Sequence, residues 1–132
     1  MLFRSLAKNP SAAAAMVLLA ELRADRGRFG EAEELLRRAT AVEPTSCEAW
    51  AGIAHLRKMT VGDAPWAAEA QRLAAQPLPP REEVHLRFAL GKYLDDVREF
   101  EDAFANFRRA HELKQRYAGR YDRQQKIGRA HV

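Results

Sequence analysis

Cysteine is almost absent from this sequence, which has a single one, Cys47, among 132 residues. One cysteine cannot close a disulfide within the chain, so a reducing compartment, the cytoplasm, is the simplest expectation. The four histidines are scattered, without a His or Cys neighbour at the spacing of zinc ligands, and we expect no metal site. A helix N-terminus would lower the pKa of Cys47, and a distant histidine would complete a nucleophile pair. A small thiol that is packed or half-exposed is the simpler expectation.

Glycine and proline are also scarce, with seven and six residues that are scattered along the chain apart from the link PLPP. This composition is unlike that of a turn-rich β protein or a low-complexity chain. The apolar run at 12–20 is nine residues long, which is too short to cross a bilayer. It continues a helical pattern at the point where a signal peptide would end in a cleavage site. We therefore expect no contact with a membrane.

A strong helical periodicity is present instead, and it is clearest from 79 to 117. Apolar residues there recur at three- and four-residue steps, which is typical of amphipathic helices. Only a few residues around 97–99 separate two such stretches, so the two helices must lie antiparallel. Pro79 and Pro80 suit the start of the first helix, where a missing N–H is harmless, and Gly91 is small where the helices would approach. The predicted inner faces comprise Val84, Leu86, Phe88, Ala89, Leu90, Tyr93, Leu94, Val97, Phe100, Ala103, Phe104, Phe107, Ala110 and Leu113.

An earlier helix pair is expected near the start of the chain. Pro10 and Pro44 are 34 residues apart, which is the period of tetratricopeptide repeats. Two helical patterns, 11–26 and 29–42, lie between them and are separated by a turn at Gly27. The expected packing positions of this repeat hold apolar residues, namely Leu19, Ala20, Ala32, Leu36 and Ala39.

The middle segment, 45–78, predicts a degenerate pair. Thr45 and Glu48 have the spacing of a capping box, in which each side chain satisfies the other residue's backbone N–H. The helix that follows is expected to run to Met59. After the turn TVGDAP, a shorter helix carries Trp66 where the repeat pattern has a small residue. The residues expected in the core of this unit are Trp50, Ile53, Ala54 and Trp66.

Together these patterns predict an all-α fold, a tetratricopeptide-like right-handed superhelix of about three antiparallel helix pairs. Neither helix of a pair can bury its apolar stripe alone, so each repeat depends on its neighbours. The predicted division places the end of a preceding repeat helix at 1–9, repeat 1 at 10–44, the degenerate repeat 2 at 45–78, repeat 3 at 79–117 and a basic tail at 118–132.

Three stretches are more specific than the repeat pattern. They are LRKMTVGDAPW, then PLPPREEVHLRFALGKYLDDVREFEDAFANFRRAHELK with its FALGK…DD…AF core, and the step Tyr121-Asp122. Through these stretches, residues 59–122 resemble the tetratricopeptide region of bacterial TPR–sulfotransferase proteins. The sequence departs from that family at Ala110-His111, where its members tend to have a small residue followed by asparagine.

The resemblance implies a scaffold that lies just ahead of a sulfotransferase domain and positions a protein or peptide substrate for it. That domain uses the cofactor 3′-phosphoadenosine 5′-phosphosulfate (PAPS). Binding PAPS needs backbone N–H groups and basic or hydroxyl side chains on a strand–loop–helix, which the family supplies as a PRSGTT-like stretch. This sequence has no such stretch and no glycine-rich phosphate loop. We therefore expect the chain itself to be no enzyme and to bind no cofactor. The alternative is a stand-alone tetratricopeptide adaptor.

The end of the chain is basic, since 108–129 carries eight Lys or Arg residues against two acidic ones. A solvated helix end is the simplest explanation of this charge. Nucleic-acid binding through the basic segment with Tyr117 and Tyr121 is an alternative that we do not favour, because no RNA- or DNA-binding motif accompanies them. The last residues, KIGRAHV, match an in-frame translation of a common sequencing adapter. Our hypothesis is that 126–132 is not native.

A groove is the feature that points to function. In tetratricopeptide stacks the first helix of each pair lines the concave face, and we predict that a peptide binds there through its side chains and backbone. Two alternatives stay open: this face packs against the parent protein's own sulfotransferase domain, or it is merely solvated. The predicted groove residues are Glu21, Glu48, His55, Lys58, His85, Phe88, Lys92 and Asp95.

Overall fold

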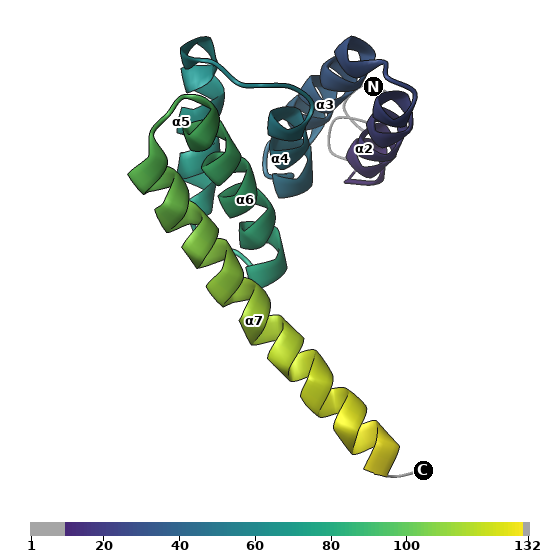
Figure 1. The fold of residues 1–132 in the computed structure, drawn as a ribbon. Helices are drawn as coiled ribbons and strands as arrows, with labels where there is room; N and C mark the ends of the chain where they lie inside the picture. Colours follow the sequence, from purple (N-terminus) through teal and green to yellow (C-terminus); the bar gives the residue numbers. More distant parts are fainter. Residues whose placement is uncertain (1–9, 131–132) are drawn as a thin grey trace.

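The computed structural model describes residues 10–130 and, within them, the side chains of 11–118. The predicted leading segment 1–9 and the last two residues of the predicted tail lie outside the described residues. The described part of the chain contains helices and no strand, which confirms the predicted all-α fold (Figure 1). Its elements are α2 (Pro10–Asp25), α3 (Phe29–Val42), α4 (Cys47–His55), the 3₁₀ turn η1 (Val61–Asp63), α5 (Ala64–Ala74), α6 (Pro80–Asp96) and α7 (Phe100–Ala130).

Two helical hairpins, α2–α3 and α6–α7, stand on either side of α4 (Figure 1). The two helices of each hairpin pack closely on each other, whereas α4 packs chiefly on α6 and α3. Helix α5 also packs more on α6 than on α4. The middle unit is therefore held together mainly through its neighbours. Helix α7 continues past the predicted end of repeat 3 at Tyr117 and runs to Ala130, away from the other helices (Figure 1).

The core is centred on α4, α5 and α6 and contains the predicted tryptophans. Trp66 is 3% exposed, and its ring centroid lies 5.8 Å from that of Tyr93. Its indole N–H donates to the backbone oxygen of Trp50 at 2.9 Å. Trp50 is half-buried and donates its own indole N–H to the oxygen of Pro44, also at 2.9 Å. Both amphipathic rings thus pack with a partner for their polar end.

The turns of the two hairpins end their first helices in the same way. In each, two backbone N–H groups beyond the helix donate to carbonyls of its last turns, which is the Schellman motif. The residue in the left-handed conformation is Gly27 in the first turn (φ 77°) and Arg98 in the second (φ 69°). The donor–acceptor pairs are Arg28–Arg23 and Gly27–Ala24 at 2.9 Å, Glu99–Leu94 at 2.7 Å and Arg98–Asp95 at 3.1 Å.

Replacing Arg98 with glycine is therefore expected to raise the free energy of unfolding by about 0.5–1 kcal/mol. A side chain costs free energy in the left-handed region, and glycine avoids most of that cost. The reverse change at the equivalent position of the first turn, Gly27→Arg, should lower the free energy of unfolding by a similar amount. Urea denaturation of both variants measures the two effects. Effects of the same sign would contradict the equivalence of the turns.

The contact between α6 and α7 is made through small residues, as the sequence predicts. A Cβ atom on Gly91 would lie only 2.6 Å from the ring of Phe107, and Ala103 is 3% exposed. Phe100 and Phe104 do not join this contact. Both are 60% exposed, which corrects their predicted place on the inner face. Each residue turns by about 100° around the helix, so Phe104 lies well to one side of Ala103 and faces away from α6.

Helix α2 buries a narrower face than the sequence predicts. Ala20 is 1% exposed, as expected of a packing position, but Leu19 is 39% exposed. The buried line of the helix consists of Ala13, Val17 and Ala20, which follow one another at helical spacing. Leu19 lies beside that line, so its predicted packing position is wrong.

Helix α4 differs from its prediction at both ends. Its N-cap is Ser46, whose Oγ accepts a backbone N–H of the first turn at 3.3 Å. Thr45, the predicted cap, donates its hydroxyl to the carboxylate of Glu43 instead. The helix ends at His55 and does not reach Met59. The backbone that follows is held by side chains from other elements, which draw it out of the helical path.

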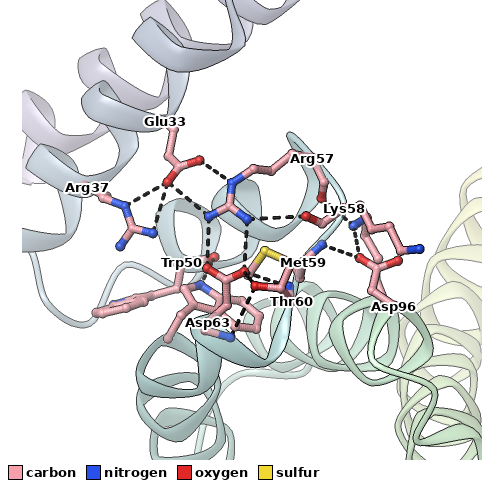
Figure 2. Close-up of polar contacts among 12 residues, drawn as sticks. Glu33, Arg37, Trp50, Arg57, Lys58, Met59, Thr60, Asp63 and Asp96 are labelled. Atoms are coloured by element: carbon pink, nitrogen blue, oxygen red, sulfur yellow. Dashed lines mark hydrogen bonds and ion pairs between the residues drawn. The ribbon is translucent and has the colours of Figure 1, made fainter.

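Charged side chains from α3, η1 and α6 hold this connection between α4 and α5 (Figure 2). Arg57 lies at the centre, where its Nε donates to Glu33 of α3 at 2.8 Å and its Nη2 donates to Asp63 of η1 at 2.9 Å. From the other side, Asp96 of α6 accepts the N–H of Met59 at 2.9 Å. Met59 is 1% exposed, so these polar contacts place an apolar side chain of the loop in the core.

Replacing Arg57 with methionine is expected to lower the free energy of unfolding by about 1–2 kcal/mol, because two carboxylates lose their shared cation. Hydrogen bonds from Arg57 lower the pKa of Asp63 to about 2 from 3.8. A lowered carboxyl pKa stabilises the folded state above the unfolded pKa, and this stabilisation is lost as the pH falls through the folded pKa. Arg57 also lowers the pKa of Glu33 from 4.5. The difference between the two proteins should therefore be complete above pH 4.5 and should shrink toward pH 2.

Urea denaturation of both proteins across that pH range measures the effect. The control is Arg72→Met, which removes an exposed pair with Glu69 on a single helix and should cost less than about 0.5 kcal/mol. An equal decrease in the free energy of unfolding in the two variants would show that Arg57 acts as an ordinary surface charge.

Candidate functional site

A hollow of about 510 Å³ lies between α2, α4 and α6, the first helices of the three pairs. Its buried lining is apolar and includes Val17 and Ala20 of α2, Leu36 of α3 and Ala51 of α4. The charged and imidazole side chains of its lining are exposed and form its rim. The hollow therefore has an apolar floor and a polar edge.

A second hollow, of about 400 Å³, continues the first toward α5. The two share Val17, Glu48 and His85, so they form one continuous surface. We call this surface the concave groove. It is lined by Ala13, Ala14, Val17, Ala20, Glu21, Ala24, Asp25, Leu36, Glu43, Thr45, Ser46, Cys47, Glu48, Ala51, Gly52, His55, Leu56, Leu73, Gln76, Leu78, Glu82, His85 and Phe88.

The structure brings five of the eight predicted groove residues together. Those that line the concave groove are Glu21, Glu48, His55, His85 and Phe88.

The other three predicted residues, Lys58, Lys92 and Asp95, lie outside the groove. Lys58 follows the end of α4 in an exposed loop, so the helical register that placed it on the concave face does not reach it. Lys92 donates its Nζ to the backbone oxygen of Arg57 at 2.8 Å and pairs with Asp96. The two predicted cations are therefore absent from the groove.

Three further carboxylates of the groove were missed by the sequence prediction, those of Asp25, Glu43 and Glu82. Asp25 follows Glu21 by four residues on α2, and this spacing places both on one face of a helix. Glu82 precedes His85 by three residues on α6, with the same consequence. Helical spacing would have found these two. Glu43 lies between helices, where no periodicity applies.

Neighbouring side chains orient one aromatic ring of the groove and change the pKa of another. Phe88 lies edge-on to His111 of α7, with 5.6 Å between ring centroids, so the second helix of the hairpin orients a groove residue. His55 is exposed, yet the protein around it removes enough water to lower its pKa. The positive charge of Lys92 and the nearby His85 add to that effect. A lowered pKa keeps the imidazole of His55 neutral near neutral pH.

Cys47 is 3% exposed, and burial raises the pKa of its thiol to about 11, with a further contribution from the charge of Glu82. A nucleophilic cysteine needs the opposite shift. Of the two expected states, packed and half-exposed, the structure shows the packed thiol. Among the described residues, no three His, Cys, Asp or Glu side chains gather as metal ligands would.

No helix within residues 10–130 is long and apolar enough to span a membrane.

Residues 1–57 match the family model of the tetratricopeptide repeat. The chain contains a tetratricopeptide region. The match covers helices α2, α3 and α4 and thus one side of the concave groove. No curated protein and no solved structure was found to match the chain.

A tetratricopeptide region suggests a protein-interaction scaffold, because such stacks present extended concave surfaces to their partners. All-helical folds of this kind are typical of non-catalytic scaffolds. That this chain has no catalytic site stays a prediction. The resemblance to TPR–sulfotransferase proteins rests on residues 59–122, beyond the matched segment, and it also stays a prediction.

Proposed function

We propose that this chain is a protein-interaction scaffold whose concave groove holds a peptide segment of a partner protein. The observation that carries the proposal is the continuity of the groove, since two adjoining hollows share Val17, Glu48 and His85. One continuous surface across α2, α4 and α6 suits an extended or helical segment better than a small compact ligand. Its apolar floor supplies affinity, and its polar rim supplies selectivity.

The test is a peptide array probed with the intact chain and with a variant whose groove is filled. Ala24 is half-buried in the wall of the larger hollow, and Ala24→Trp would occupy that hollow. Ala105 is exposed on α7 outside the groove, so Ala105→Trp is the matched control. Peptides that bind the intact chain should bind the control and fail to bind the filled variant. Equal binding to all three proteins would reject the groove as the site, provided that their thermal denaturation curves agree.

We further propose that this scaffold works beside a sulfotransferase domain and positions a protein or peptide substrate for it. The support is the resemblance of residues 59–122, which include Asp63 of η1, the residue that accepts a hydrogen bond from Arg57. The DNA after the codon for Gln125 provides the test. An open frame with a PRSGTT-like motif supports the proposal, and it would also show that 126–132 is foreign. A stop codon in the native gene at that place would favour a stand-alone adaptor.

A further inference from the structure

The charge in the concave groove is of one sign. Five carboxylates line it and no lysine or arginine does, although the chain has 22 Lys or Arg residues and 18 Asp or Glu residues. A concave surface with a low-dielectric floor focuses the field of the charges around it, so such a groove attracts cations. The five carboxylates are those of Glu21, Asp25, Glu43, Glu48 and Glu82.

These carboxylates are not neutralised from within the described part of the chain. On the other faces, Glu33 pairs with Arg57 and Glu83 pairs with Arg109. By contrast, the side chains of Glu21, Asp25, Glu48 and Glu82 form no ion pair or hydrogen bond with any described residue. All four are exposed. They are therefore available to a cation that comes from outside.

The apolar floor limits what that cation can be. Val17, Leu36 and Ala51 are each 5% exposed or less, and they lie beneath the acidic rim. A lysine or arginine can place its aliphatic stem along such a floor while its charged end reaches the carboxylates. Apolar side chains on either side would fill the rest of the floor. Metal ions and small polar cations would leave it uncovered.

We propose that the concave groove takes a basic segment of a separate partner protein, in which Lys or Arg side chains alternate with apolar ones. This rests on the proposed function of the groove and names the chemical class of its partner. Nucleic acid does not fit this surface, because its phosphates would face five carboxylates.

The probe is a set of three synthetic peptides that share one length and one pattern of leucines. They differ only in their remaining positions, which are lysine, glutamine or glutamate. Fluorescence anisotropy with the intact chain should give the tightest binding for the lysine peptide and the weakest for the glutamate peptide. The affinity for the lysine peptide should fall as salt is added, because the screening length shortens to about 10 Å at 0.1 M.

Glu48 lines both hollows, so Glu48→Gln should weaken binding of the lysine peptide by about three- to tenfold. Its effect on the glutamine peptide should be small. Glu34 is an exposed residue of α3 outside the groove, and Glu34→Gln is the matched control with unchanged binding. Both substitutions keep the size of the side chain, and circular dichroism would verify that both variants fold.

Each result decides the question. Equal affinity for the lysine and glutamine peptides, abolished in both cases by Ala24→Trp, would overturn the basic partner while the groove keeps its function. If none of the three peptides binds, the basic partner is rejected, and the peptide array then tests the groove by itself. If sedimentation shows that the lysine peptide only displaces a second copy of the chain, that copy is the occupant and the assignment of a separate partner is wrong.

Discussion

Replacing Gly91 with valine is expected to lower the free energy of unfolding by about 3 kcal/mol, because the new side chain has no space between α6 and α7. Its Cβ atom alone would lie 2.6, 2.7 and 2.9 Å from three ring carbons of Phe107, and valine adds two methyl groups. The ring cannot swing away freely, since it packs against the core and against Phe88, with 6.3 Å between the two centroids. The hairpin must therefore open to admit the side chain. Urea denaturation measures the loss.

The same substitution at Gly30 is the matched control. Gly30 is also helical, but a Cβ there would meet no atom within 4 Å. Gly30→Val should be neutral or stabilise α3 by a few tenths of a kcal/mol, since glycine is a poorer helix former than valine. Replacing the opposing ring with a smaller side chain, Phe107→Leu, should recover part of the stability that is lost in Gly91→Val. A double-mutant cycle would measure the coupling between the two positions. Additive effects of the two changes would contradict the close approach.

The close approach at Gly91 also illustrates what the sequence alone could predict. Helical periodicity, a proline pair before α6 and a glycine in the first turn are local signals, and they correctly located the two hairpins. Ala103 and Ala20 were placed correctly because small residues at helical spacing suit close packing. Phe100 and Phe104 fit the three- and four-residue spacing of the inner face but lie at its margin, where periodicity alone cannot separate buried from exposed positions. The inner face of α7 contains Ala103, Phe107, Ala110 and Leu113, and Phe100 and Phe104 lie beside it in solvent.

Contacts between residues distant in sequence could not be predicted from periodicity. Arg57 and Glu33 are 24 residues apart, and Met59 and Asp96 are 37 apart, yet each pair forms a hydrogen bond that holds the loop after α4. The same kind of contact changed the predicted groove. Lys92 has the helical register of a groove residue, but Asp96 and a backbone oxygen hold it elsewhere. The groove is therefore more acidic than its sequence suggested.

A further long-range cluster, around Glu83, predicts the second large effect. Glu83 is 7% exposed, and one of its oxygens accepts hydrogen bonds from the Nε atoms of Arg87 and Arg109, both at 3.1 Å. Arg87 in turn donates to the side chain of Asn106 and to the backbone oxygen of Ala74. One carboxylate thus joins α5, α6 and α7 at the end of the hairpin opposite its turn.

Replacing Glu83 with alanine should lower the free energy of unfolding by about 2–3 kcal/mol. It leaves two guanidinium groups side by side without an anion. Fully buried pairs cost more when broken, but Arg87 and Arg109 keep part of their side chains in water, at 26% and 38% exposure. The neighbouring change Glu82→Ala is the control. Glu82 is exposed and contributes only its interaction with the helix dipole, about 0.3–1 kcal/mol.

The pH dependence separates this ion cluster from simple packing. Burial alone would raise the pKa of Glu83, but hydrogen bonds from Arg109 and Arg87 outweigh it and lower the pKa below 4.5. A lowered carboxyl pKa means that the stabilisation is complete above pH 4.5 and is lost as the pH falls through the folded value. The gap in stability between the intact chain and Glu83→Ala should therefore close in acid. A difference in the free energy of unfolding that stays constant down to acid pH would show that Glu83→Ala acts through lost packing. The three helices would then be joined by apolar and van der Waals contact and not by charge.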